Sequence, residues 1–372
     1  MTVLILGVST RAIAQSATRA SYDVRTIDFF GDRDQERCCP NLSLRRDLQV
    51  PFSAWELFRA ALRDDAQPVD GVVYLANLEN HPDVIAALAT RFRVLGNASA
   101  TVASVRNWET LAASVNGLGF ATPRTLRTED APPERRWLSK PRRSGGGAGI
   151  RPWQGEPLRR GRIVQEYVEG PPCSVTFAAD GKRAIVLAIN EQLIGRREFG
   201  ATGFQYCGNI LPLAAGRDPA LADRLQVLVD GLVRDFGLVG VGGVDFVLAD
   251  EQPVILEVNP RYTGSMELIE RATGLSVFET HLHAIDGMLP ETGMLRAFTG
   301  YWGKAIVFAS RPIVMADHES WLERGLCDVP HAGDRIEAGQ PVCTVMAQGT
   351  TRELCLAALA AGAKEVYREL DG

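Results

Sequence analysis

Two apolar segments in the second half of the chain carry acidic and amide side chains, and this pattern constrains the fold more than any other feature. The segment GVDFVLAD contains Asp245, and QPVILEVNP, after the Asp250-Glu251 turn, contains Glu257 and Asn259. The short turn predicts an antiparallel hairpin. Side chains two positions apart on a strand share a face, so Glu257 and Asn259 point the same way and Asp245 can lie across from them.

Three oxygen ligands on one face suit Mg²⁺, which prefers carboxylates and substrate phosphates. The hairpin therefore predicts a magnesium site at Asp245, Glu257 and Asn259. Arg261 follows on the same alternation, where its planar fork of donors suits a phosphoryl group or a carboxylate. A buried face would not carry these charges without partners. The alternative is an exposed face whose side chains pair with one another.

A lysine before a glycine-rich loop is the second candidate site. The segment KPRRSGGGAGI begins at Lys140 and contains Gly145, Gly146, Gly147 and Gly149. Glycines let backbone N–H groups approach phosphate oxygens, and the lysine adds a positive charge. Because the lysine precedes the glycines, the order is not that of a P-loop. A surface loop without a ligand is the alternative.

The third candidate is the end of the predicted strand RIVQEYV (162–168), which turns at Gly170. Backbone N–H and C=O groups along such a strand edge can meet the edge of an adenine ring. Taken alone, the segment is more typical of an ordinary strand end before a turn.

In this order, the three elements resemble the ATP-grasp superfamily of carboxylate–amine and carboxylate–thiol ligases. The resemblance covers about residues 98–290, and the twelve residues from Asp245 to Glu257, followed by Asn259 and Arg261, make it specific. It implies an ATP-grasp fold of two subdomains, with ATP and Mg²⁺ as cofactors.

The resemblance also implies a role for each candidate residue. The implied site comprises Lys140 on the ATP phosphates, Gly145, Gly146, Gly147 and Gly149 as the lid, backbone groups of Gln165 and Val168 on adenine, Asp245, Glu257 and Asn259 on magnesium, and Arg261 on the transferred phosphoryl group.

The chain departs from the family pattern at two positions. Trp108 stands where many members carry a second phosphate-contacting lysine, and Arg106 is a candidate replacement. Pro172 stands where many members have a ribose-contacting glutamate, for which Glu169 can substitute.

Strand and helix signals alternate through the first hundred residues, which predicts a doubly wound parallel sheet over 1–97. Such sheets bind ligands at the carboxyl ends of their strands, so Ser9, Asp28 and Glu79-Asn80 are candidates there. Turn and cap roles suit these residues equally well.

The remaining chain predicts two further units. Residues 98–290 read as an α+β ATP-grasp domain with a helix over 100–118, antiparallel strands, a long helix Pro219–Phe236 and an adenine linker near 165–170. Residues 291–372, which end in another helical segment, predict a small C-terminal lobe.

The composition excludes several classes of protein. With 40 Lys and Arg against 45 Asp and Glu, the net charge of −5 disfavours sequence-independent nucleic-acid binding. No apolar run reaches the ~18 residues of a membrane span, and the N-terminal MTVLILGVS is expected to be a buried strand, not a signal peptide. Seven scattered cysteines without a CxxC pair indicate reduced thiols and a cytoplasmic location.

The expected activity is the formation of an amide from a small-molecule carboxylate and an amine through an acyl phosphate. The N-terminal pattern and the tail further resemble ATP-grasp proteins linked to methanofuran and tetrahydromethanopterin metabolism, and tyramine–glutamate ligases. A homodimer is the default assembly.

Three alternatives to an amide ligase remain open. They are a non-catalytic ATP-binding regulator, an ATP-grasp enzyme with a thiol or bicarbonate acceptor, and a nucleotide-dependent oxidoreductase, which the missing GxGxxG disfavours. Candidate recognition residues, for each of which a structural role is favoured over a functional one, are Arg196, Arg197, Tyr206, Asn209, Tyr262 and Glu267.

Overall fold

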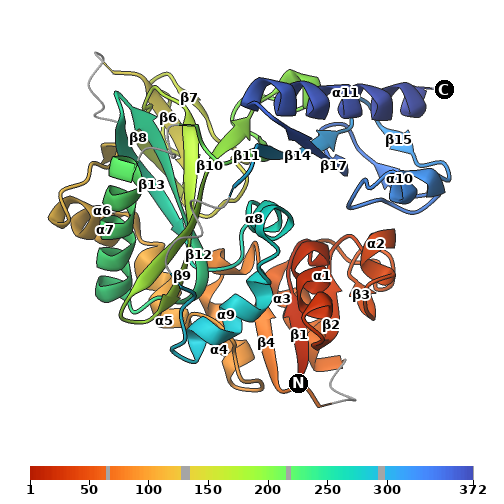
Figure 1. Ribbon diagram of the computed structural model, residues 1–372, viewed down its shortest axis with the longest axis horizontal. Coiled ribbons are helices and arrows are strands. Elements are labelled where there is room, and N and C mark those ends of the chain that lie inside the picture. Colours follow the sequence, from red (N-terminus) through yellow and green to blue (C-terminus); the bar gives the residue numbers. More distant parts are fainter. Residues whose placement is uncertain (64–67, 127–134, 215–218, 292–297, 372) are drawn as a thin grey trace.

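The computed structural model describes residues 1–63, 68–126, 135–214, 219–291 and 298–371. Its first unit is a four-stranded parallel sheet in the order β3-β2-β1-β4 (Figure 1). The strands are β1 (Thr2–Leu6), β2 (Asp23–Asp28), β3 (Asn41–Ser43) and β4 (Gly71–Tyr74). The parallel sheet predicted for the N-terminal region is confirmed.

Helices cover both faces of this sheet, which explains why its neighbouring strands β1 and β4 are almost continuously apolar. Alternate side chains of β1 enter different cores: Val3 packs with α1 (Arg11–Arg19), and Leu4 packs with α3 (Ala54–Arg63) and α4 (Pro82–Ala89). Two shorter elements, α2 (Arg33–Glu36) and η1 (Leu78–Asn80), follow the ends of β2 and β4.

The helical structure predicted over 100–118 is confirmed, but it is not one continuous helix. The structure contains α5 (Ser99–Val105) and α6 (Trp108–Gly117) instead. Asn107 has an extended backbone, and its side chain accepts hydrogen bonds from two N–H groups in the first turn of α6. This cap starts a new helix and ends the previous one.

A small antiparallel sheet follows, in the order β5-β8-β6-β7. Its strands are β5 (Thr125–Leu126), β6 (Trp137–Pro141), β7 (Arg151–Trp153) and β8 (Arg162–Glu166). The glycine-rich loop connects β6 to β7, and the predicted adenine linker leaves the end of β8.

A seven-stranded antiparallel sheet forms the centre of the molecule, in the order β13-β12-β9-β10-β11-β14-β17 (Figure 1). Its strands are β9 (Pro172–Asp180), β10 (Ala184–Ile194), β11 (Tyr206–Leu211), β12 (Val239–Ala249), β13 (Gln252–Asn259), β14 (Tyr301–Phe308) and β17 (Pro341–Gly349). The domain boundary predicted at 290/291 stays a prediction. Strands from both sides of this boundary share the central sheet. Residues 292–297 lie outside the described residues.

Both faces of the central sheet are buried. Phe177 of β9 packs in the core beneath α7 (Pro219–Phe236), whereas its neighbour Ala178 faces the core that contains α8 (Met266–Thr273) and α9 (Val277–Ile285). The second core also contains residues of β1 and α1, so the N-terminal unit and the central sheet share apolar packing.

The C-terminal residues complete a third core. The helix α11 (Arg352–Asp371) packs against β14 and β17. The shorter elements of this region are η2 (Arg197–Phe199), α10 (Glu319–Glu323), β15 (Ile313–Val314) and β16 (Arg335–Ile336). Within the described ranges, no helix combines the length and apolarity needed to cross a membrane.

The packing of α7 generates a stability prediction. Leu228 is fully buried beneath the helix, whereas its neighbour Val227 is 57% exposed. Leu228→Ala should therefore lower the free energy of unfolding by about 2–5 kcal/mol, measured by urea denaturation. Val227→Ala, the matched control, should change it by less than about 0.5 kcal/mol. Equal losses from both substitutions would contradict this orientation of α7.

Candidate active site

A cavity of about 480 Å³ lies between the small antiparallel sheet and the central sheet. All three elements predicted from the sequence reach it. The predicted residues that line it are Lys140, Gly145, Gly146, Gly147, Gln165, Val168, Asp245, Glu257, Asn259 and Arg261. Two predicted residues do not line it: Gly149 accepts a hydrogen bond from Arg162 through its carbonyl, and Glu169 is exposed at the surface.

The polar face of the β12–β13 hairpin has the predicted geometry. Asp245 and Glu257 lie directly across from each other in register. The Asn259 amide donates to Asp245 Oδ2 at 3.0 Å, and the amide of Gln192, on β10, donates to Asp245 Oδ1 at 3.0 Å. Two carboxylates and an amide oxygen thus converge at one wall of the cavity.

The pKa values of the two carboxylates are shifted in opposite directions. Burial raises the pKa of Asp245 to about 7, and the facing charge of Glu257 adds to the rise. Burial also disfavours the charged form of Glu257, yet the charges of Arg106, Lys140 and Arg261 hold its pKa at about 2. A bound cation would favour the ionised form of Asp245.

The positive charges of Arg106, Lys140 and Arg261 all act on Glu257. Arg106 Nη1 lies 3.2 Å and Lys140 Nζ 3.7 Å from Glu257 Oε2. Trp108 buries its indole Nε1 with no hydrogen-bond partner among the described residues. At this wall Arg106 therefore supplies positive charge, and Trp108 supplies none.

Arg261 is held in place by Glu79, a residue of the N-terminal unit. Its Nη2 donates to Glu79 Oε1 at 2.6 Å and to Asn259 Oδ1 at 3.3 Å. Its Nε is buried without a partner among the described residues, so one donor of the guanidinium is left for a ligand. Asn80, next to Glu79, accepts from Arg106 Nη2 at 3.1 Å. The candidates Glu79 and Asn80 thus contact two arginines of the site and do not line the cavity themselves.

The glycine-rich loop is anchored to the segment before β11. The N–H of Tyr206 donates to the Gly146 carbonyl at 3.0 Å. Gly147 has φ +76°, and a Cβ there would lie 1.8 Å from the carbonyl oxygen of Phe204. Only glycine allows this close approach. Gly145, in contrast, has open space around it.

Gln165 and Val168, the two residues predicted to contact adenine, differ in whether their backbone groups are already hydrogen-bonded. Gln165 is paired on both sides, with Thr125 of β5 and Leu138 of β6. Val168 lies beyond the paired part of the strand, and its backbone makes no hydrogen bond to any residue in the described part of the chain. Val168 is therefore better suited than Gln165 to meet a ligand edge.

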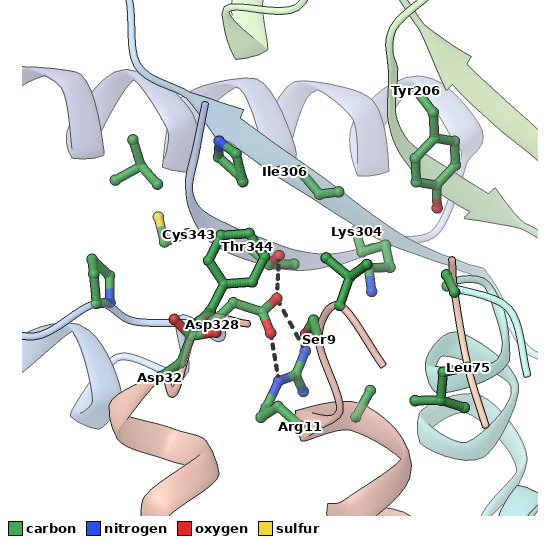
Figure 2. Close-up of a pocket in the computed structure, with 18 of the residues that line it drawn as sticks. Ser9, Arg11, Asp32, Leu75, Tyr206, Lys304, Ile306, Asp328, Cys343 and Thr344 are labelled. Carbon is green, nitrogen blue, oxygen red and sulfur yellow. Dashed lines mark hydrogen bonds and ion pairs between the residues drawn. The ribbon is translucent and has the colours of Figure 1, made fainter. Parts of the chain in front are cut away.

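A second cavity, of about 290 Å³, adjoins the first and shares Tyr206, Arg261, Thr263 and Gly264 with it. Figure 2 shows it between Ser9 of the loop after β1 and Arg11 at the start of α1 on one side, and Lys304 and Ile306 of β14 on the other. Ser9 is thus in a cavity, as its place in the sequence suggested. Asp28 has a structural role in the adjoining turns instead, because it accepts hydrogen bonds from the N–H groups of Thr10 and Gly31.

The recognition candidates divide between the two cavities. Tyr206 and Asn209 line the first, Tyr206 and Tyr262 line the second, Glu267 is buried behind the second, and Arg196 and Arg197 line neither. Sequence reasoning missed Gln192 and Ser174, which line the first cavity. The available signal was polar residues within the otherwise apolar strands β9 and β10.

The described residues contain no cluster of three or more His, Cys, Asp or Glu side chains that could hold a metal on its own. The hairpin face supplies two carboxylates and an amide, so a magnesium ion there would take its other ligands from a substrate phosphate or water. The donor chemistry fits Mg²⁺ on these terms.

Comparison with known proteins agrees with this geometry. Residues 107–265 match the model of the ATP-grasp domain. Over 94% of its length the chain is 21% identical to an uncharacterised protein of Methanocaldococcus jannaschii, of which it covers 89%.

Solved structures share the whole architecture. The biotin carboxylase domain of the Hydrogenobacter thermophilus 2-oxoglutarate carboxylase, crystallised with MgADP, ADP and bicarbonate, superposes with a TM-score of 0.70 at 14% identity, covering 95% of this chain and 88% of that one. An L-amino acid ligase from Bacillus licheniformis gives 0.65 at 16% identity, covering 100% and 96%. The chain thus has an ATP-grasp fold.

The anchored loop generates a testable prediction. Gly147→Ala should detach the glycine-rich loop from Phe204, because its Cβ cannot occupy the present position. Trypsin should then cleave after the exposed Arg142 and Arg143 several-fold faster than in the wild type. Gly145→Ala, the matched control, should cleave at the wild-type rate. Equal rates for both variants would contradict the close approach.

The raised pKa of Asp245 generates a second prediction. In the folded protein this pKa lies near 7 and exceeds its ordinary value, so stability contributed by the protonated form is lost as the pH rises through 7. Without metal, the free energy of unfolding of the wild type should fall relative to Asp245→Asn by about 2–3 kcal/mol between pH 5 and 8. Urea denaturation in EDTA measures this difference, and parallel pH profiles for the two proteins would refute it.

Proposed function

We propose that this chain, whose residues 107–265 match an ATP-grasp domain, is an ATP-dependent ligase that joins a small-molecule carboxylate to an amine. One observation carries the proposal. The paired carboxylates Asp245 and Glu257 face the same cavity as Lys140, the glycine-rich loop and Arg261. This set can neutralise the phosphates of a nucleotide and the group that receives a phosphoryl unit.

The first cavity is assigned to MgATP. Val168 would offer its free backbone groups to adenine, and Lys140 and the lid N–H groups would contact the phosphates. Asp245, Glu257 and Asn259 would hold magnesium. When bound, this ion supplies neutralisation of the negative charge that phosphoryl transfer develops. Glu169 remains the candidate for a ribose contact, in place of the glutamate that many family members have at the position of Pro172.

Arg261 is assigned to the reacting groups because it lines both cavities. A carboxylate oxygen of the substrate bonds to the γ-phosphorus as the bond to ADP breaks, and the amine nitrogen then displaces phosphate from the acyl carbon. Arg261, fixed by Glu79, would stabilise the oxygens at both steps. The closed lid would exclude water, which otherwise hydrolyses the acyl phosphate.

Finer assignments belong to the same proposal. A role in one-carbon cofactor assembly, with glutamate and tyramine as the first substrates to test, follows from the subgroup resemblance. We also propose a homodimer in the cytoplasm.

A catalytically inactive ATP-binding regulator is the second candidate, favoured by Trp108 at the position of a lysine. The contact of Arg106 with Glu257 weighs against it, since Arg106 brings positive charge to the same wall.

The test is magnesium-dependent release of ADP across a grid of carboxylates and amines. A ligase releases ADP only when both substrates are present. Turnover of the double variant Asp245→Asn/Glu257→Gln should fall by about 10²-fold or more, as expected when preorganised charge stabilisation is removed.

The matched control is Asp250→Asn/Glu251→Gln, at the exposed tip of the same hairpin. It should keep full activity. Full activity in the Asp245/Glu257 variant would refute the site. Tight MgATP binding without turnover on any pair would favour the regulator.

A further inference from the structure

The second cavity has two chemically different ends. Figure 2 shows Asp32 and Asp328 at one end and Lys304, Leu75 and Tyr206 at the other. Because Tyr206 also lines the first cavity, the Asp32 end is the one remote from the nucleotide site. A molecule that spans the cavity would therefore place one end at Asp32 and the other near the reacting groups.

The basic side chains of this cavity are already neutralised by carboxylates. Arg11 pairs with Glu267 and Asp328, Lys304 with Glu267, Arg45 with Asp334, and Arg261 with Glu79. Asp328 is fully engaged, since it accepts hydrogen bonds from Arg11 and from Thr344 Oγ1 at 2.6 Å. These groups leave little net positive charge for an anionic ligand.

Asp32 differs from its neighbours. It is only 6% exposed, and its carboxylate makes no hydrogen bond or ion pair within the described residues. The residue is at the N-cap of α2, where an aspartate usually bonds to the N–H groups of the first turn. Its backbone carbonyl does accept from Gln35 and Glu36, yet its side chain makes no cap hydrogen bond and lines the cavity instead.

The surroundings of Asp32 call for a cation. Burial and the nearby carboxylates of Asp328, Asp28 and Asp34 raise the pKa of Asp32 well above its usual range, and the opposing effect of Arg45 is smaller. An unpaired buried carboxylate is costly, whereas a charge-assisted hydrogen bond to an ammonium group would satisfy it.

The rest of the cavity lining is mainly apolar. It includes Phe30, Ile306, Ile336 and Val342. A hydrocarbon or aryl segment would be buried favourably here, whereas a polar chain would lose hydration. The cavity thus favours a ligand with a charged terminus and an apolar body.

We propose that the second cavity binds a substrate through a primary ammonium group held by Asp32, so that the group which reacts lies at the other end, near Tyr206 and Arg261. The inference rests on the proposed function, because it takes this cavity as the substrate site. The shared chemistry is an ammonium group separated from the reacting group by an apolar spacer. It has two possible sources, an amino acid that reacts through its carboxylate or a diamine that reacts through its second nitrogen.

Calorimetric titration with matched six-carbon probes tests this inference. Hexylamine should bind at least tenfold more tightly than hexanoate or hexanol. Tighter binding of 6-aminohexanoate than of 1,6-diaminohexane assigns the amino acid as the source, and the reverse assigns the diamine. Either order supports the ammonium site.

Asp32→Asn should abolish the preference for hexylamine, because the amide keeps the shape of the side chain and loses its charge. Asp32→Glu should retain the preference in part. Asp83→Asn, in the exposed first turn of α4, is the matched control and should bind as the wild type does. Melting temperatures establish that each variant is folded.

Two results would overturn the inference: hexanoate that binds as well as hexylamine, or a folded Asp32→Asn variant that binds hexylamine like the wild type. A separate titration with MgADP keeps the proposed function distinct. If MgADP binds and hexylamine does not, only the ammonium site fails. If MgADP does not bind, the nucleotide assignment fails whatever the amine probes show.

Discussion

One buried guanidinium joins the parts of the chain that form the two cavities. Arg11 of α1 is 1% exposed. It donates to both carboxylate oxygens of Glu267 on α8, at 2.5 and 3.0 Å, and to Asp328, before β17, at 2.9 Å. Lys304 of β14 also donates to Glu267 at 3.0 Å. Because a buried charge that loses its partner costs about 3–5 kcal/mol, these groups hold the N-terminal unit, the central sheet and the C-terminal strands in one arrangement.

Two carboxylates that line the cavities, Asp245 and Asp32, differ from the members of this network. Every member of the Arg11 network has an opposite charge in contact, so the network is satisfied without a ligand. Asp245 has only amide donors beside it, and Asp32 has no hydrogen-bond donor from the described residues. Each of these two carboxylates is therefore less stable in its charged form than its neighbours. Unsatisfied charge of this kind is typical of functional sites, where a ligand completes the interaction.

The sequence could predict those features that depend on neighbouring residues. The hairpin and the shared face of Glu257 and Asn259 follow from strand alternation and a two-residue turn, both of which are local. The pairing of Asp245 with Glu257 depends in addition on a register shift between Asp245 and Phe246, because the turn alone would place Asp245 opposite Leu256. The parallel N-terminal sheet follows from alternating strand and helix signals. The helical structure of residues 100–118 was predicted, but the break at Asn107 was not. In contrast, β11 and the pairing of β14 with it depend on partners almost a hundred residues apart. The contact of Arg11 with Asp328 spans 317 positions, and no local pattern indicates it.

The N-terminal unit contributes side chains to the candidate active site, although its sequence lacks the glycine motif of a dinucleotide-binding sheet. Its short helix η1 supplies Glu79, which orients Arg261, and Asn80, which contacts Arg106 and donates to the Ser144 carbonyl beside the glycine-rich loop. A single turn after β4 thus touches the arginine shared by both cavities, a cation beside Glu257 and the base of the lid. The loop after β2 places Asp32 in the second cavity from the same sheet edge. The carboxyl ends of these parallel strands therefore supply side chains to the second cavity and to two arginines of the site, at the sheet edge where ligands are usually bound.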